Sequence, residues 1–286
     1  GKNVQEFEEI LSTYFGRPVV CVSSGTAALH LSLQAAGLDD DDEVLVQSLT
    51  YIACFQAISA TGARPISCDV NLKTLCIDLK DAEKKITSKT KAIMPVHYSG
   101  GVGDLDGVYS LAKKYNLRVI EDSAHAFGTF YNGKKIGSFG DIACFSFDGI
   151  KNITSGEGGC IVTDDSNVLK KIKDARLLGV ESDTDKRYCN ERSWGVSVSS
   201  QGWRYHMSNI MAAIGIEQFK SFPMFLEKRK ELAKYYDELL SHHEKVITIK
   251  HNYQNVVPHI YVIRIMGMSN RNELQNKLLE KGIQTG

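Results

Sequence analysis

Short apolar runs alternate with amphipathic stretches over the first 121 residues, and this alternation constrains the fold more than any other feature. The runs expected to form strands are 18–22, 43–47, 65–68, 91–96 and 117–121. The stretches with apolar residues at helical spacing are 25–36, 52–60, 82–86 and 108–115. Continuous apolar strands separated by helices predict an α/β fold with a mostly parallel sheet covered on both faces. Such sheets bind ligands at the carboxyl ends of their strands.

The pattern changes after residue 130. Strands are expected at 142–147 and 159–163, followed by a helix at 168–178 and a polar, irregular stretch at 181–203. Helices are expected at 207–219, 226–240 and 272–280, with strands at 246–249 and 259–265. We therefore predict a large domain over residues 1–222 and a smaller α+β domain over residues 223–286. We expect this C-terminal domain to be incomplete.

Charge and cysteine usage narrow the functional classes. Lys+Arg and Asp+Glu both number 34, and a net charge of zero gives no support for a nucleic-acid or membrane-surface partner. No apolar run approaches the roughly 20 residues of a membrane span. The 7 cysteines are irregularly spaced and mostly lie in apolar runs, which favours reduced thiols in a cytoplasmic protein. We predict no metal site.

A lysine and an aspartate each lie next to the end of a predicted strand. Lys151 follows the run that ends at Phe147 and precedes a glycine-rich stretch at 156–159, and Asp122 closes the run 117–121. Such a pair can hold opposite ends of a pyridoxal phosphate ring, because the lysine bonds to its aldehyde and the carboxylate keeps its ring nitrogen protonated. The alternatives are a solvated loop lysine and an aspartate in a structural ion pair or cap.

Further candidates follow other predicted strands. Gly25 and Thr26 begin the helix after the first strand, where glycine and free main-chain amides suit a phosphate, although the same residues suit a simple helix cap. Tyr51 could stack on a planar ring or be a core or interface tyrosine. His125 could bond to the phenolic oxygen of the cofactor or be a satisfied core histidine.

The ordered set of motifs resembles the DegT/DnrJ/EryC1/StrS family, the nucleotide-sugar aminotransferases of pyridoxal phosphate fold type I. The resemblance covers essentially the whole chain. It rests on residues 24–29 (SGTAAL), 48–51 (SLTY), 121–126 (EDSAHA), 145–147 (FSF) with Lys151, 156–159 (GEGG) and 205–209 (YHMSN).

The resemblance implies a large domain with a seven-stranded type of sheet and a role for each matching position. Lys151 would form the covalent link to the cofactor, and Asp122 and His125 would contact the ring nitrogen and the phenolic oxygen. Tyr51 would stack on the ring. The residues that would hold the phosphate are Gly25, Thr26 and Ser146.

The resemblance also implies a homodimer with a shared active site, because a loop of the neighbouring subunit completes the phosphate site in such enzymes. Here that loop is the segment 202–206, with Arg204 and His206 where many relatives have an asparagine at one of the two positions. A cation at either position can meet a phosphate. The segment 97–101, which begins at His97, resembles the part of the family near the sugar site.

The implied activity is amination of a keto-deoxysugar attached to a nucleotide, with glutamate as amino donor, for polysaccharide or glycan biosynthesis. Two alternatives stay open. Relatives that act as sugar dehydratases have histidine in place of the lysine, so Lys151 argues against that reaction. A non-catalytic, cofactor-binding regulatory protein would not need both Lys151 and Asp122.

Overall fold

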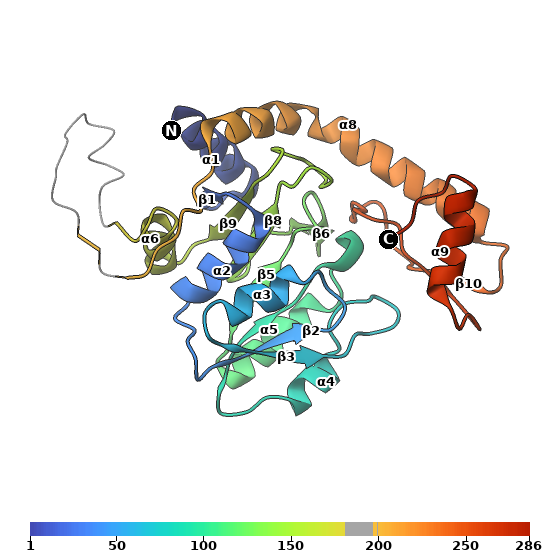
Figure 1. The fold of residues 1–286 in the computed structure, drawn as a ribbon, viewed down its shortest axis with the longest axis horizontal. Coiled ribbons are helices and arrows are strands. Elements are labelled where there is room, and N and C mark those ends of the chain that lie inside the picture. The colour runs from blue at the N-terminus through green and yellow to red at the C-terminus, as the bar shows by residue number, and fades with distance from the viewer. Residues whose placement is uncertain (181–196, 199) are drawn as a thin grey trace.

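A computed structural model of the chain describes residues 1–180, 197–198 and 200–286 (Figure 1). The predicted 181–203 stretch lies largely outside these residues. The helices and strands are, in chain order, α1 (Lys2–Phe15), β1 (Val19–Val22), α2 (Gly25–Ala35), β2 (Glu43–Gln47), α3 (Ala53–Ser59), β3 (Arg64–Cys68), α4 (Leu79–Lys84), β4 (Thr90–Met94), η1 (Tyr98–Gly100), α5 (Leu105–Tyr115), β5 (Arg118–Asp122), β6 (Phe130–Tyr131), β7 (Lys134–Lys135), β8 (Ile142–Ser146), β9 (Gly159–Thr163), α6 (Ser166–Ala175), α8 (Asn209–Leu240), β10 (Val246–Thr248), β11 (Ile263–Ile265) and α9 (Arg271–Glu280).

The central sheet has seven strands in the order β1-β9-β8-β5-β4-β2-β3. The pairs from β3 across to β8 are parallel, and β9 is antiparallel to both of its neighbours. The predicted mostly parallel α/β sheet is therefore confirmed. Since β1 and β8 both run opposite to β9, the carboxyl ends of β1, β2, β4, β5 and β8 lie along one edge.

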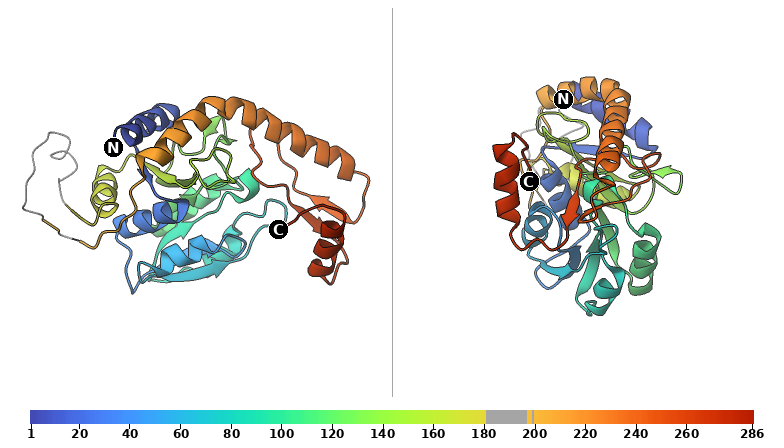
Figure 2. Two further views of the ribbon diagram at one scale, coloured as in Figure 1. Left: turned by 45° about the horizontal axis from the view of Figure 1, so that its top comes forward. Right: turned by 90° about the vertical axis from the view of Figure 1, so that its right-hand side faces the viewer.

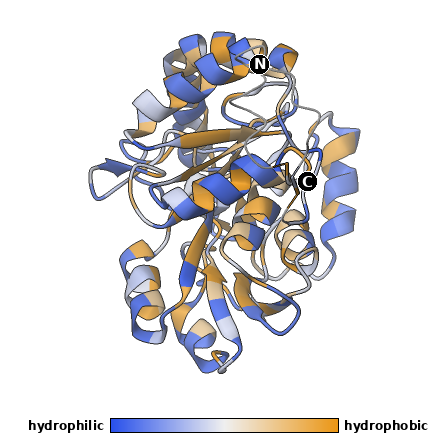
Figure 3. Cartoon of the chain, turned by 90° about the vertical axis from the view of Figure 1, so that its left-hand side faces the viewer, coloured by the Kyte–Doolittle hydropathy of each residue, from blue (hydrophilic) through white to orange (hydrophobic). Residues whose placement is uncertain are grey.

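Helices cover both faces of this sheet. Buried side chains of α1, α5 and the first part of α8 pack on one face, and those of α2, α3 and α6 pack on the other. Figure 3 shows apolar central strands, with helices that carry an apolar stripe and a polar outer side. Both faces thus bury apolar residues, as expected for a parallel sheet.

Helix α1 was not among the predicted elements, although its sequence carries the helical signal. Val4, Phe7, Leu11 and Phe15 follow at three- and four-residue intervals, and all four are buried. The helix packs along α8, where Gly215 makes room for an aromatic ring. A Cβ atom at Gly215 would lie 2.7 Å from the ring of Phe7.

Helix α8 replaces two predicted helices with one. Its 32 residues continue through the exposed Pro223, which removes one main-chain hydrogen bond without ending the helix. The helix spans from α1 to the C-terminal elements (Figure 2). The predicted boundary between residues 222 and 223 lies inside it, and the division into two domains at that point stays a prediction.

Between the two strands of its small sheet, β10 and β11, the C-terminal segment returns to residues that follow β4 and β5. The strand predicted at 259–265 is limited to β11, which pairs with β10. The preceding residues bind the large domain instead: the amide of Val257 donates to Thr129 Oγ1 at 3.1 Å and that of His259 to Ser99 O at 3.0 Å. No described helix is long and apolar enough to cross a membrane.

Candidate active site

The carboxyl ends of β5 and β8 bring the predicted residues together. Asp122 is the last residue of β5 and pairs with Cys144 of β8, which ends two residues later at Ser146. Lys151 follows in the loop that connects β8 to β9. Because neighbouring parallel strands end at the same edge, residues separated by 24 or 29 positions in the chain share one site.

Four hydrogen bonds within the chain fix the position of Asp122. Its amide donates to Pro95 O at 2.9 Å, and its carbonyl accepts from the amide of His97 at 3.0 Å. Its carboxylate accepts from the amide of Ala124 at 3.1 Å and from the thiol of Cys54 at 2.9 Å. With 7% of its surface exposed, Asp122 is a buried and fully oriented acceptor.

Lys151 is half-buried in a tight turn, in which its amide donates to Asp148 O at 3.0 Å. Burial lowers the pKa of its ammonium group, and the charges of Asp122 and Asp148 act in the opposite direction. A lysine with a lowered pKa has more of its amine in the neutral, nucleophilic form.

Two histidines lie beside the lysine. His125 accepts from the amide of Ser99 at 3.3 Å, and its ring centroid is 4.3 Å from that of His259. Burial, with the nearby Lys151 ammonium, lowers the pKa of His125 to about 4. Burial, followed by His125, Lys151 and Arg229, lowers the pKa of His259 to about 2. Both rings are therefore neutral at physiological pH.

His259 is a site residue that the sequence analysis missed. Its Nε2 atom lies 3.5 Å from Lys151 Nζ, and its Nδ1 atom is buried with no hydrogen-bond partner among the described residues. It lies 134 residues after His125 in the sequence, so no local motif links the two. Only the return of the C-terminal segment to the large domain brings it here.

The glycine loop before α2 has the close packing that an anion site needs. A Cβ atom at Gly25 would lie 2.8 Å from Ser146 Cβ, so only glycine fits there. Ser24 caps the helix by accepting from the amide of Ala27. The amides of Gly25 and Thr26 begin the helix, where main-chain donors have no intrahelical partner. Ser24 therefore caps the helix, while the amides of Gly25 and Thr26 stay available for an anion.

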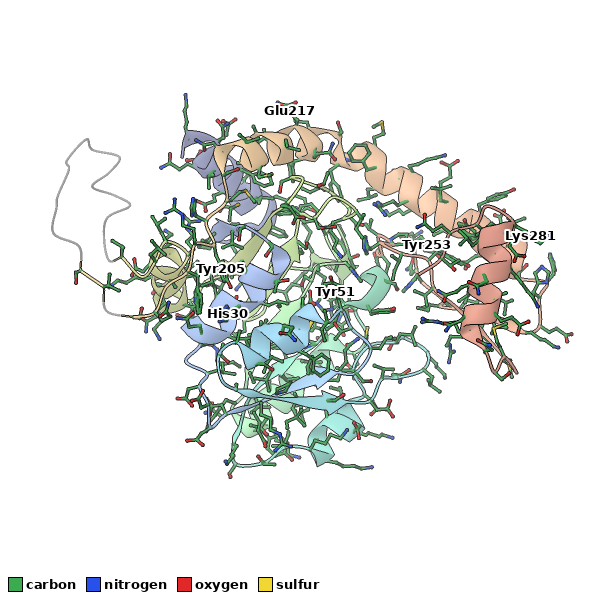
Figure 4. All side chains as sticks on the ribbon, in the orientation of Figure 1. His30, Tyr51, Tyr205, Glu217, Tyr253 and Lys281 are labelled. Carbon is green, nitrogen blue, oxygen red and sulfur yellow. The ribbon has the colours of Figure 1, made fainter. Side chains whose placement is uncertain are left out.

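Tyr51 and Arg204 are exposed, Tyr51 to 73%, and the only other exposed candidate among the described residues is Thr26. The segment with Arg204 and His206 lies along β1 of its own chain, where Tyr205 O accepts from the amide of Ser23 at 2.7 Å. Figure 4 shows Tyr205 beside His30 and away from Tyr51. Burial, with Arg204 and Arg176, lowers the pKa of His206. No described contact joins Arg204 or His206 to Lys151 or Asp122.

His97 follows β4 in the buried interior. It is 0% exposed, and its Nε2 atom is 2.7 Å from Glu121 Oε2. Glu121 also accepts from the hydroxyl of Tyr109 at 2.6 Å. Glu121 directly precedes Asp122 in β5, so its hydrogen bonds to His97 and Tyr109 fix the end of this strand.

A mostly parallel sheet with a lysine and a buried aspartate at adjacent strand ends defines the class of pyridoxal phosphate-dependent transferases of fold type I. The chain belongs to the DegT/DnrJ/EryC1/StrS aminotransferase family, whose model matches residues 1–286. The family predicted from the motifs is thus confirmed.

Individual relatives agree with this assignment. The chain is 39% identical to GDP-perosamine synthase of Escherichia coli O157:H7 over 100% of its own length and 76% of the relative's. It is 42% identical to the uncharacterized protein MJ1066 of Methanocaldococcus jannaschii, over 87% of its length and 64% of that protein. The chain therefore spans less than two thirds of the latter relative.

A solved structure gives the same fold and bears on the cofactor. The putative sugar aminotransferase Spr1654 of Streptococcus pneumoniae superposes with a TM-score of 0.89 at 31% identity, over 99% of this chain and 76% of that one. It has been solved in PMP and PLP forms. The predicted cofactor, pyridoxal phosphate, agrees with these forms, and it fits the packing of Gly25 against Ser146, the half-buried Lys151 and the buried Asp122.

Proposed function

We propose that the chain is an aminotransferase that converts a nucleotide-linked keto-deoxysugar to an amino sugar, with glutamate as amino donor. The observation that carries the proposal is that the buried Asp122 ends β5 while the half-buried Lys151 follows the neighbouring parallel strand β8, so that both lie at the same edge of the sheet. The family and the GDP-perosamine synthase relative support a nucleotide-sugar substrate. The product would serve polysaccharide or glycan biosynthesis.

The chain's residues would hold pyridoxal phosphate at three points. The first amides of α2, at Gly25 and Thr26, and the hydroxyl of Ser146 would bind the phosphate. Asp122 would accept from the protonated ring nitrogen, and His125 would lie by the phenolic oxygen. When bound, the cofactor supplies an aldehyde for amines and a ring that withdraws electrons from the substrate carbon.

Lys151 has two tasks in this proposal. Its neutral amine would hold the cofactor covalently, and the same amine, when free, would carry a proton to and from the substrate. The neutral imidazole of His259 lies 3.5 Å from the amine and places no positive charge beside it. Asp122 would accept from the protonated ring nitrogen, and two donors, the thiol of Cys54 and the amide of Ala124, fix the orientation of its carboxylate.

We further propose a homodimer in the cytoplasm, with Arg204 and His206 of each chain at the phosphate of the other. His206 lies against Val22 of β1 and Arg204 against Leu177, without a described contact to Lys151, and these positions, with the exposure of Tyr51, support a partner at this face. A sugar dehydratase of the same fold is disfavoured by Lys151. A non-catalytic regulatory protein is disfavoured by the retained lysine–aspartate pair.

The visible absorbance spectrum tests this function. Wild-type protein mixed with pyridoxal phosphate should develop an absorbance band that is shifted from that of the free cofactor and bleaches on addition of L-glutamate, and Lys151→Ala should lack this shifted band. A band that ignores glutamate would contradict the proposed donor. Absence of any band in the wild-type chain would contradict the proposed cofactor site.

A further inference from the structure

A cysteine thiol lies against the carboxylate that is proposed to face the cofactor. Cys54, in the first turn of α3, points its Sγ atom at Asp122 Oδ2 over 2.9 Å. An ionised carboxylate only accepts hydrogen bonds, so the thiol is the donor. Cys54 is 0% and Asp122 7% exposed, and water therefore does not compete strongly for this bond.

The contact is part of a chain of three side chains. Thr50 Oγ1 lies 3.1 Å from Cys54 Sγ, on the turn that also carries Tyr51. The other carboxylate oxygen, Oδ1, accepts from the amide of Ala124 at 3.1 Å. Each oxygen of Asp122 is thus held from a different direction, and rotation of the carboxylate would break at least one of the two bonds.

A thiol suits this position because it is a weak and permanent donor. Burial, followed by the charge of Asp122, raises the pKa of Cys54 well above its usual value, so the proton stays on the sulfur. A weak donor orients the carboxylate and leaves its lone pairs available to a stronger donor. The ring N–H of a protonated pyridine is such a donor, and it forms a charge-assisted bond.

We propose that Cys54 is a positioning residue, whose thiol orients the carboxylate of Asp122 toward the cofactor's ring nitrogen. The inference rests on the proposed function, which places Asp122 at that nitrogen. It differs from the sequence-based interpretation of the cysteines as small apolar core residues. Another thiol of the same core, Cys144, lies 3.2 Å from Ser32 Oγ and makes no hydrogen bond to Asp122, so it provides a matched control.

Infrared spectroscopy of the cofactor-free protein tests the contact itself. The S–H stretching band of Cys54 is identified as the band that is lost in Cys54→Ala. It should lie at a lower frequency than that of a free thiol, because the thiol donates to a carboxylate. Asp122→Asn should raise this frequency. A Cys54 band at the frequency of a free thiol, unchanged in Asp122→Asn, would overturn the proposal. This measurement uses the wild-type sulfur, so it does not depend on the folding of Cys54→Ala alone.

Titration with pyridoxal phosphate, followed by absorbance, tests the consequence. Cys54→Ala should bind about two- to tenfold more weakly, the loss expected for one hydrogen bond. Cys54→Ser, which keeps a donor, and Cys144→Ala should both bind like wild type. Unchanged binding by folded Cys54→Ala would overturn the role of Cys54. Failure of the wild-type chain to bind would instead overturn the proposed function.

Discussion

The lysine–aspartate part of the candidate site and its tyrosine–arginine part differ in how completely this chain builds them. Asp122 and Ser146 are 7% and 8% exposed, and Lys151 is half-buried beside them. Tyr51 is 73% exposed, and Arg204 is exposed along β1. The side chains of the lysine–aspartate part are enclosed by their own chain, whereas those of the tyrosine–arginine part face solvent.

This difference in exposure predicts how substitutions in the two parts of the site should affect activity. In the buried part, a substitution removes a group that no other molecule can replace, so losses should be large and independent of protein concentration. In the exposed part, a second copy can supply the missing group, so losses should be repairable by mixing. The predictions below test this contrast.

Replacement of Lys151 should have the largest effect. Lys151→Ala removes both the covalent link and the proton carrier, so turnover should fall by about 10³-fold or more. The rate of amino-sugar formation measures this, with the exposed Lys89→Ala as a control. The folded signal in circular dichroism should match wild type. Near-normal turnover in Lys151→Ala would remove Lys151 from the mechanism.

Asp122→Asn should have the next largest effect. The amide keeps the shape of the side chain but carries no charge to hold a proton on the ring nitrogen, so turnover should fall by about 10²-fold. Steady-state rates measure the loss, and denaturant unfolding should show a smaller change than the rates imply. The exposed Asp41→Asn serves as control. An unchanged rate would mean that Asp122 faces something other than the ring nitrogen.

The two parts also differ in how far the sequence could predict them. Recognisable strands end at or near Asp122 and Ser146, and Lys151 lies in the loop after the second of them. Because neighbouring parallel strands end at one edge of the sheet, the strand pattern predicts that these three residues lie close together. His259 and Cys54 had no such signal, because one reaches the site through a long-range return of the chain and the other looks like an ordinary core cysteine. Two helices were predicted where α8 is continuous, because the packing at both ends of α8 is invisible in the local sequence.

Subunit mixing should sharpen the contrast. Lys151→Ala chains and chains with Arg204→Ala and His206→Ala should each be weak alone. After mixing in equal amounts and reassembly, a twofold dimer with shared sites should regain about a quarter of wild-type activity, since half of the dimers carry one intact site each. Activity across mixing ratios measures the rescue. A flat response would contradict the proposed placement of Arg204 and His206 at the partner's phosphate.

The smallest effect at working pH should come from His125, and it should appear on acidification. Its pKa is about 4 in the folded chain, with burial as the first cause, against 6.5 as the ordinary value. Between these values the unfolded chain binds a proton that the folded chain does not. The free energy of unfolding should therefore fall with decreasing pH by about 3 kcal/mol for this group, and the loss should be complete below about pH 4.

Urea unfolding of the cofactor-free protein between about pH 7 and about pH 5 measures the first part of this loss, about 2 kcal/mol. His125→Gln keeps an acceptor for the amide of Ser99 and cannot titrate, so its stability should depend less on pH than that of wild type. The exposed His242→Gln should keep the wild-type slope. If His125→Gln kept that slope as well, the acid sensitivity would have to come from another group. His259, with its still lower pKa, is then the first variant to compare, since it packs on the same ring.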